Sequence, residues 1–274
     1  MNSRVSTTIM VNLLLVMIAA LSLGPLLWML SVSFMQPGEA SHFPAPWLPS
    51  TPTLQNYRQL FERSGMGRHF VNSLVISIGV MASSVLVNTL AGYAFAKLRS
   101  RGRDKVFRAM LAALVIPAQV AMMPLFLLLK EMGLVNTWVG AMVPGLAGIF
   151  GIYLVRQYAR SIPDELLEAA RIDGAGEWRI FWQIVLPVLK PILVTLGIFS
   201  FLGAWNDFMW PLIVLGDQSL QTLPVALASL SREHVQDNEL MMAGSVVTIL
   251  PVLVLFLVLQ RYYIQGLLVG SVKG

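Results

Sequence analysis

Long apolar stretches separated by short polar segments are the main pattern along this chain of 274 residues. An α-helix rises about 1.5 Å per residue, so about 20 apolar residues cross the ~30 Å hydrocarbon core of a bilayer. Stretches of this length occur at 8–33, 70–96, 106–129, 138–157, 184–215 and 241–264. The pattern predicts an all-α, polytopic membrane protein with six transmembrane helices.

Composition agrees with a lipid environment, since 56% of the residues are hydrophobic and only 12% are charged. A soluble domain carries about twice that charged fraction. The absence of cysteine excludes disulfides, thiolate metal sites and cysteine nucleophiles. The histidines are far apart in polar segments, at His42, His69 and His234. We therefore expect no metal site and no catalytic residue.

Lys and Arg residues predict the orientation, because they concentrate in the cytoplasmic loops of membrane proteins. With six spans, fourteen of the nineteen fall on the side that holds both termini. The first span is interpreted as a retained helix, because its apolar run is too long for a signal peptide. We expect a multi-pass protein of the cell (inner) membrane with both termini in the cytoplasm.

The cytoplasmic segment 161–187 is the most informative loop. Ser161, Pro163 and Asp164 form a helix-start signal, and Gly174 is a helix-stop signal. They predict a short helix over 164–173, followed by an amphipathic helix over 176–186 that leads into the fifth span. The first helix is acidic, which does not suit an anionic leaflet and favours docking on another protein. An interfacial position on the headgroups remains the alternative for the second helix.

The residues of this loop carry a specific resemblance. Glu168-Ala169-Ala170, Gly174 and Ile184-x-Leu186-Pro187 resemble the EAA loop of ABC-importer permeases. The resemblance extends over nearly the whole chain to the carbohydrate-uptake branch, of the maltose-permease type. Its other matching segments are 56–57, 72–73, 91–98, 205–212 and 270–274.

This resemblance implies a type I ABC-importer (MetI-like) transmembrane domain over 68–266. An N-terminal helix and outer loop over 1–67 would precede it, and a cytoplasmic tail over 267–274 would follow. The EAA helix would dock on an ATPase subunit, through Glu168, Ala169, Ala170, Asp173 and Gly174. The implied partners are a second, homologous permease, an ABC ATPase dimer and an extracytoplasmic solute-binding protein. The chain lacks the G-x-x-x-x-G-K-[ST] phosphate loop, so ATP and Mg²⁺ are expected on the ATPase and no cofactor is expected here.

Polar groups inside spans are expensive in lipid and are candidates for the transport pathway. Amides and a carboxylate would bind the hydroxyls of a sugar, and aromatic rings would stack on its C–H face. The candidates are Asn72, Asn88, Tyr93, Gln119, Trp205, Asn206, Asp207 and Trp210. Asn206 and Asp207 have an alternative role, because near the outer boundary they could cap helices or contact the binding protein. The long polar outer loops at 34–69 and 216–240 are expected to dock that protein.

Other classes of function are less well supported. An ion-coupled secondary transporter would be expected to show inverted repeats and buried carboxylates, and a membrane enzyme would need a catalytic constellation. Neither pattern is present, and no aromatic-interleaved basic patch indicates nucleic acid. The residues do not choose among cargoes, so a sugar, glycerol-3-phosphate and other solutes stay open.

Overall fold

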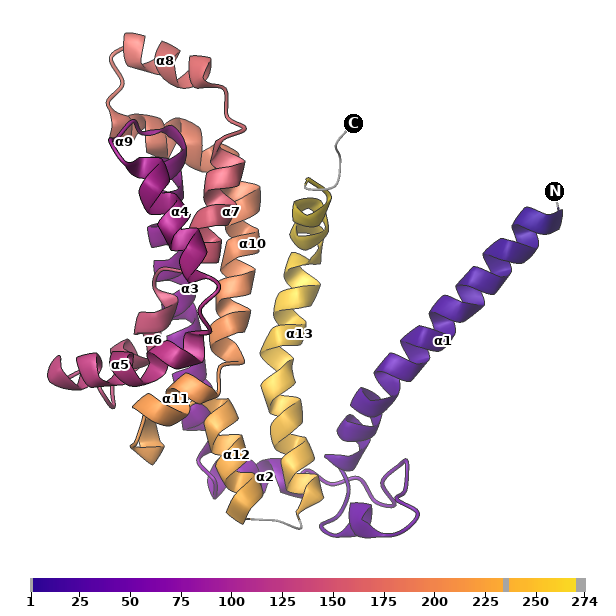
Figure 1. The fold of residues 1–274 in the computed structure, drawn as a ribbon. Coiled ribbons are helices and arrows are strands. Elements are labelled where there is room, and N and C mark those ends of the chain that lie inside the picture. Colours follow the sequence, from indigo (N-terminus) through magenta and orange to yellow (C-terminus); the bar gives the residue numbers. More distant parts are fainter. Residues whose placement is uncertain (1, 234–236, 270–274) are drawn as a thin grey trace. The chain divides into compact units, whose positions relative to one another are not determined.

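Helices form all the regular secondary structure of the computed structural model within the residues that it describes, 2–233 and 237–269 (Figure 1). The all-α prediction is confirmed. The α-helices are α1 (Asn2–Val32), α2 (Gln55–Glu62), α3 (Met66–Lys97), α4 (Arg103–Ala113), α5 (Ala118–Glu131), α6 (Trp138–Met142), α7 (Ile149–Ala159), α8 (Asp164–Ile172), α9 (Glu177–Ile180), α10 (Leu186–Trp205), α11 (Met209–Val214), α12 (Leu223–Glu233) and α13 (Asn238–Val269). Short 3₁₀ turns η1 (Glu39–Ser41), η2 (Val143–Gly145) and η4 (Gln218–Leu220) lie between them, and η3 (Phe181–Val185) is a π-helical turn.

Four segments of the described chain are continuous helices long and apolar enough to cross a bilayer: Thr7–Val32, Met66–Lys97, Glu177–Trp205 and Asn238–Leu259. Two further spans form only if each of two bent helix pairs is counted as one. The six predicted stretches thus correspond to four continuous helices and two bent pairs.

The third predicted span, 106–129, is not one straight helix. Its two halves, α4 and α5, meet at a bend of 105°. Pro117 sits at this break with extended backbone, at ψ 130°. Proline lacks the N–H that would continue the helix, and it disfavours helical backbone in the preceding residue. The fourth predicted span bends by 48° between Trp138–Gly145 and Ile149–Ala159, where Pro144 and an extended Gly148 interrupt the helix.

The fifth predicted span, 184–215, also differs in detail. The π turn η3 joins α9 to α10, so the helix is continuous from Glu177 to Trp205. Pro187 lacks the N–H that an α-helix would direct at the Gln183 carbonyl. One residue earlier, the Leu186 N–H donates to the Phe181 carbonyl, five residues back, which is the π-helical pattern. Beyond Trp205 the helix stops, and the separate helix α11 covers the rest of the predicted span.

The chain forms two compact units: 1–67 with 226–251, and 68–225 with 252–274. The second unit contains two apolar clusters. One packs α7, the segment 162–167 and the start of α10 around Val155, Leu167 and Val185, and the other packs α5, α6 and α11 around Leu129 and Trp210. The predicted division at 67 and 266 stays a prediction. Gly270–Gly274 of the predicted tail lie outside the described residues.

Candidate functional site

The helix α8 projects the predicted EAA residues from the second unit (Figure 1). Glu168, Ala169 and Asp173 are exposed and Ala170 is half-buried. Only Leu167 of this helix is buried, at 1% exposure, and it packs in the cluster with Ile162 and Ile180. One edge of α8 therefore holds it on the protein, while the rest of its surface is open.

A glycine turn ends α8 as the sequence predicts. Gly174 has φ +81°, the left-handed region that favours glycine. The Ala175 N–H donates to the Ala170 carbonyl at 2.9 Å, and the Gly174 N–H donates to the Arg171 carbonyl at 3.0 Å. These two bonds form a Schellman motif, which satisfies the last carbonyls of the helix. The motif sets the angle at which the chain turns from α8 into α9.

Lys97, the last residue of α3, holds the start of α8. Its Nζ donates to the Ile162 carbonyl at 2.5 Å and to Asp164 Oδ1 at 2.6 Å. The Lys97 side chain is 6% exposed and that of Asp164 is 75% exposed. The hydrogen bond from Lys97, and then its charge, hold the pKa of Asp164 below its usual value. An ion pair thus joins a transmembrane helix to the first turn of α8.

A second polar connection joins the far end of α8 to the same transmembrane helix. Glu177 Oε1 accepts a hydrogen bond from Arg171 Nε at 2.7 Å, and its Oε2 accepts one from the Tyr93 hydroxyl at 3.0 Å. The Tyr93 ring also lies 5.4 Å from that of Phe181, centroid to centroid. Tyr93 is a predicted pathway residue; the structure places it against Glu177 and Phe181 beside the end of α8, and a part in the pathway stays a prediction.

Two of the predicted pathway residues share a hollow of about 340 Å³ in the second unit. Asn88 lies in its wall, where its Nδ2 donates to Ser84 Oγ at 2.8 Å and its Oδ1 accepts from the Gly148 N–H at 3.1 Å. Asp207 also lines this hollow. Ser84 and Ser200 add hydroxyls to the same wall, and their Oγ atoms are hydrogen-bonded at 2.9 Å. The hollow therefore combines amide, hydroxyl and carboxylate groups within an apolar surround.

Buried positions hold three other pathway candidates. Asn72 donates to the carbonyls of Ser219 and Gln221, at 2.9 and 3.0 Å. Trp205 is 1% exposed and stacks on Phe201. Trp210 is 3% exposed, and its Nε1 donates to the Gly140 carbonyl at 3.1 Å. In this conformation these side chains contact protein, and their part in the pathway stays a prediction.

The last two candidates are exposed. Gln119 lies in the first turn of α5. Asn206 follows α10, and its Nδ2 donates to the Leu202 carbonyl at 2.9 Å. That contact to its own helix agrees with the capping alternative for Asn206, whereas its part in transport stays a prediction.

Sequence reasoning missed several residues of both sites. Ser84 lies four residues before Asn88, so the two share one helix face, and this spacing was a usable signal. Ser200 comes from a different helix, and only the tertiary structure places it beside Ser84. The sequence places Lys97 among the loop charges and in the matching segment 91–98, but gives it no structural partner. Its contact with Asp164 spans 67 residues of sequence and has no local signal.

Known proteins resemble this chain over most of its length. Residues 88–269 match the family described as "Binding-protein-dependent transport system inner membrane component". The arabinooligosaccharides transport system permease protein AraQ of Halalkalibacterium halodurans is 41% identical, over 82% of this chain and 81% of that protein. The melibiose/raffinose/stachyose import permease protein MelC of Bacillus subtilis is 34% identical, over 99% of both chains.

A solved structure confirms the fold. A chain from a bacterial ABC transporter involved in import of the acidic polysaccharide alginate matches with a TM-score of 0.84, at 23% identity, over 96% of this chain and 98% of that one. The family match covers more than half of the present chain, and relatives above 30% identity align along most of it. This chain belongs to the family of inner membrane components of binding-protein-dependent transport systems, as a permease subunit.

Proposed function

We propose that this permease forms half of the translocation pathway for a carbohydrate in an ATP-driven importer, working by alternating access. The names of the two relatives, which refer to arabinooligosaccharides and to melibiose, raffinose and stachyose, support a di- or oligosaccharide cargo. A second, homologous permease would complete the pathway. The ATP and Mg²⁺ would be bound by a separate ATPase dimer, and this subunit would have no enzymatic activity.

The connection between α8 and α3 is the observation that carries this proposal. Lys97 holds the first turn of α8, and Tyr93 holds Glu177 just beyond its end. A partner that moved α8 would therefore move the cytoplasmic end of a 32-residue helix with it. Without these contacts, α8 could move relative to α3, and the movement of the partner would not reach the transmembrane helix.

The open surface of α8 supports ATPase docking there. Ala169 presents a small exposed side chain, with the apolar Leu166 and Ile172 nearby, 45% and 86% exposed. Exposed apolar side chains gathered on one short helix mark an interaction site. Their neighbours Glu168 and Asp173 would supply polar contacts at the rim of that interface.

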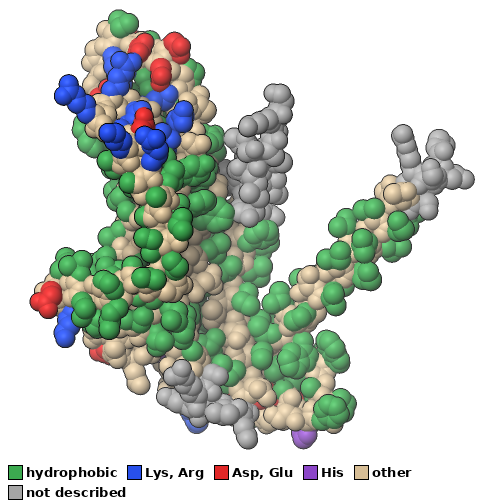
Figure 2. All heavy atoms as spheres, viewed as in Figure 1, with side chains coloured by type: hydrophobic (Ala, Val, Ile, Leu, Met, Phe, Trp, Pro, Cys, Tyr) green, Lys and Arg blue, Asp and Glu red, His purple; other side chains and the backbone are tan. Residues whose placement is uncertain are grey.

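The charges of the second unit support a cytoplasmic position for α8. Lys and Arg side chains gather at the end of this unit that carries α4, α8 and α9 (Figures 1 and 2). Lys97 lies at this end, because its ammonium contacts Asp164 at the start of α8. By the positive-inside rule this end would face the cytoplasm, and a cytoplasmic position of both termini stays the expectation from an even number of spans.

The polar hollow is proposed as this subunit's contribution to the pathway. Ser200 and Asp207 would supply a hydroxyl and a carboxylate to sugar hydroxyls, whereas the buried Ser84 and Asn88 bond to each other and would reach a sugar only after rearrangement. Phe150 and Phe199 also line it and offer rings for the C–H faces of a sugar. The partner permease would close the open side. Unchanged uptake and selectivity after alanine substitution of both Asn88 and Asn206 would remove these two amides as pathway groups.

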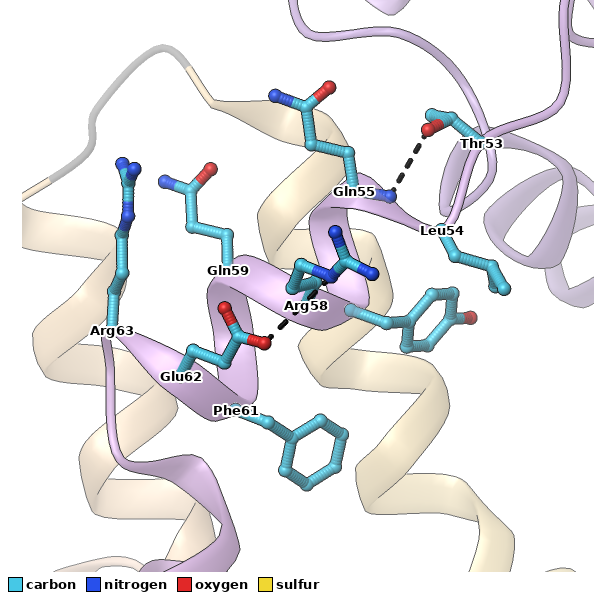
Figure 3. A pocket seen from close by; sticks show the side chains of 9 residues that line it. Thr53, Leu54, Gln55, Arg58, Gln59, Phe61, Glu62 and Arg63 are labelled. Carbon is cyan, nitrogen blue, oxygen red and sulfur yellow. Dashed lines mark hydrogen bonds and ion pairs between the residues drawn. The ribbon is translucent and has the colours of Figure 1, made fainter.

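The outer segments 34–69 and 216–240 are proposed to contact the solute-binding protein. On the first of them, residues of α2 and the adjoining turn line a shallow hollow of about 840 Å³ (Figure 3). Its lining mixes apolar and polar side chains, including an exposed Arg58–Glu62 ion pair at 3.8 Å. Residues 234–236 of the second segment lie outside the described residues.

Copurification tests the ATPase assignment. Tagged chain should bring down a second permease and an ATPase. Ala169→Leu should reduce the ATPase recovered, because the added side chain fills space at the exposed surface of α8. Ser100→Leu adds an apolar side chain to another exposed cytoplasmic position and should leave recovery unchanged. Full ATPase recovery with Ala169→Leu, or solute transport by the isolated chain, would refute the proposal.

Ligand binding by the cognate solute-binding protein tests the cargo. Binding of a di- or oligosaccharide is the expected result. Selective binding of glycerol-3-phosphate or another non-sugar solute would overturn the carbohydrate assignment and leave the permease assignment intact.

A further inference from the structure

The outer loop between α1 and α2 is ordered by its own hydrogen bonds. The Thr53 N–H donates to the Phe34 carbonyl at 2.8 Å and closes the loop. Inside it, the Glu39 carboxylate accepts from the Gln36 N–H at 3.0 Å and from the Ser50 N–H at 2.6 Å. These contacts give a loop of about 20 residues a defined shape.

Contacts outside the loop hold it at two more points of the first unit. Glu239, fully buried at the start of α13, accepts from the Ala40 N–H at 2.7 Å. The buried Asn56 side chain donates to the carbonyls of Ser33 and Met35, at 3.0 and 2.8 Å. The loop is therefore a built element whose exposed side chains are held in place.

The tip of this loop exposes large apolar side chains. Phe43 is 101% exposed, Trp47 72% and Leu48 76%, and hydrophobic side chains gather over this part of the first unit (Figure 2). No Lys, Arg, Asp or Glu occurs from 43 to 57. Single exposed apolar residues are ordinary, but three on one ordered hexapeptide indicate an interaction surface.

Two hydrogen bonds fix the depth of this tip along α1. Trp28 Nε1 donates to the Pro46 carbonyl at 3.4 Å, and Ser31 Oγ donates to the Trp47 carbonyl at 2.6 Å. Trp28 lies four residues before the end of α1 at Val32, about 6 Å along the helix axis. The loop thus turns back beside the last turn of an apolar span whose Leu27 is itself 62% exposed.

We propose that residues 43–48 form a membrane anchor, with Phe43, Trp47 and Leu48 inserted among the phospholipid headgroups of the outer leaflet. Aromatic and aliphatic side chains at this depth suit the boundary between headgroups and acyl chains. The anchor would fix the outer end of α1 in the bilayer. The binding protein is the less suitable occupant, because the tip lies at the depth of a span and the polar surface lies on α2. There, Gln55, Gln59 and Arg63 point away from Leu54 and Phe61 (Figure 3).

Single cysteines test this directly, since the chain has no native cysteine. Phe43→Cys, Trp47→Cys and Leu48→Cys are labelled with a nitroxide, and the assembled transporter is reconstituted in phosphatidylethanolamine–phosphatidylglycerol vesicles. Collision rates with oxygen, which concentrates in lipid, are compared with those of a water-soluble nickel chelate. Gln55→Cys, exposed on the polar side of α2, is the matched control. The three tip labels should show an oxygen-to-nickel ratio several-fold above that of the control.

Other outcomes would overturn the proposal. Tip labels as open to nickel as the label at Gln55 would place the tip in water. Labels shielded only after the solute-binding protein is added would make that protein the occupant. Because three separate positions are measured, one variant that fails to assemble leaves the other two to decide. Neither result bears on ATPase recovery, so the proposed transport function is tested separately.

Discussion

Substitutions at Gly174 can distinguish the effect of turn geometry at the end of α8 from the effect of contact with a partner subunit. At φ +81° a residue with a side chain is strained by about 1–2 kcal/mol. Since 1.4 kcal/mol corresponds to a factor of ten, Gly174→Ala should disfavour the native turn roughly 5- to 30-fold. A Cβ added at Gly174 would meet no atom within 4 Å, so this cost is conformational and not steric within the chain.

A substitution series distinguishes the two causes. Asparagine tolerates left-handed backbone, whereas a β-branched residue there is a strong outlier. If turn geometry dominates, ATPase recovery and ATP hydrolysis by the assembled transporter should fall in the order Gly, Asn, Ala, Val. Gly176 is the matched control, because it has φ −71° and nothing within 4 Å of an added Cβ. Gly176→Ala should therefore cost only a weaker N-cap of α9, a smaller loss than the strained turn at Gly174. An order by size, with Asn worse than Ala, would refute the conformational reasoning and indicate close approach of the ATPase.

Three further predictions concern the connection to α3 and the packing of the spans. Lys97→Met removes two hydrogen bonds from a buried ammonium and should lower ATP-driven uptake more than ATP hydrolysis. Lys97→Arg should restore part of the uptake, and equal loss of both activities would contradict a coupling role. The pKa of Asp164 lies below its usual 3.8, so the charged contact is complete above that value and is lost only as pH falls through the lowered pKa. The effect of Lys97→Met should therefore be constant from about pH 5 to 8, and a change within that window would contradict the assignment. Gly92→Ala would bring a Cβ to 2.6 Å from Val155, and such overpacking costs about 1–3 kcal/mol. It should lower the melting temperature of the purified permease, whereas Gly203→Ala, with open space around its Cβ, should not.

The length of the apolar stretches and the charge of the loops between them were enough to predict the class of protein and the approximate span positions. The reason is that lipid imposes one requirement on every span, an apolar length near 20 residues. The start of α8 and the turn at Gly174 were equally legible, because a helix-start signal and a left-handed glycine act locally. Pro117 predicts a possible kink in its span, but not a break of 105°. Proline can kink a membrane helix or end it, and the surrounding packing decides which.

Contacts distant in sequence needed the tertiary structure. Tyr93 and Asn88 look alike in the sequence, as polar residues on one apolar helix, yet one bonds to Glu177 and the other lines the hollow with Ser200. The sequence offers Trp205 and Trp210 as sugar-stacking candidates, and packing places both below 4% exposure, so that role stays a prediction. Sequence alone predicted apolar spans and a short helix ended by a glycine turn, because those properties depend on composition and short-range backbone preference; the EAA assignment of that helix rests on resemblance. Which polar groups face a hollow, and which hold α8 to α3, was decided only when helices far apart in the chain packed together.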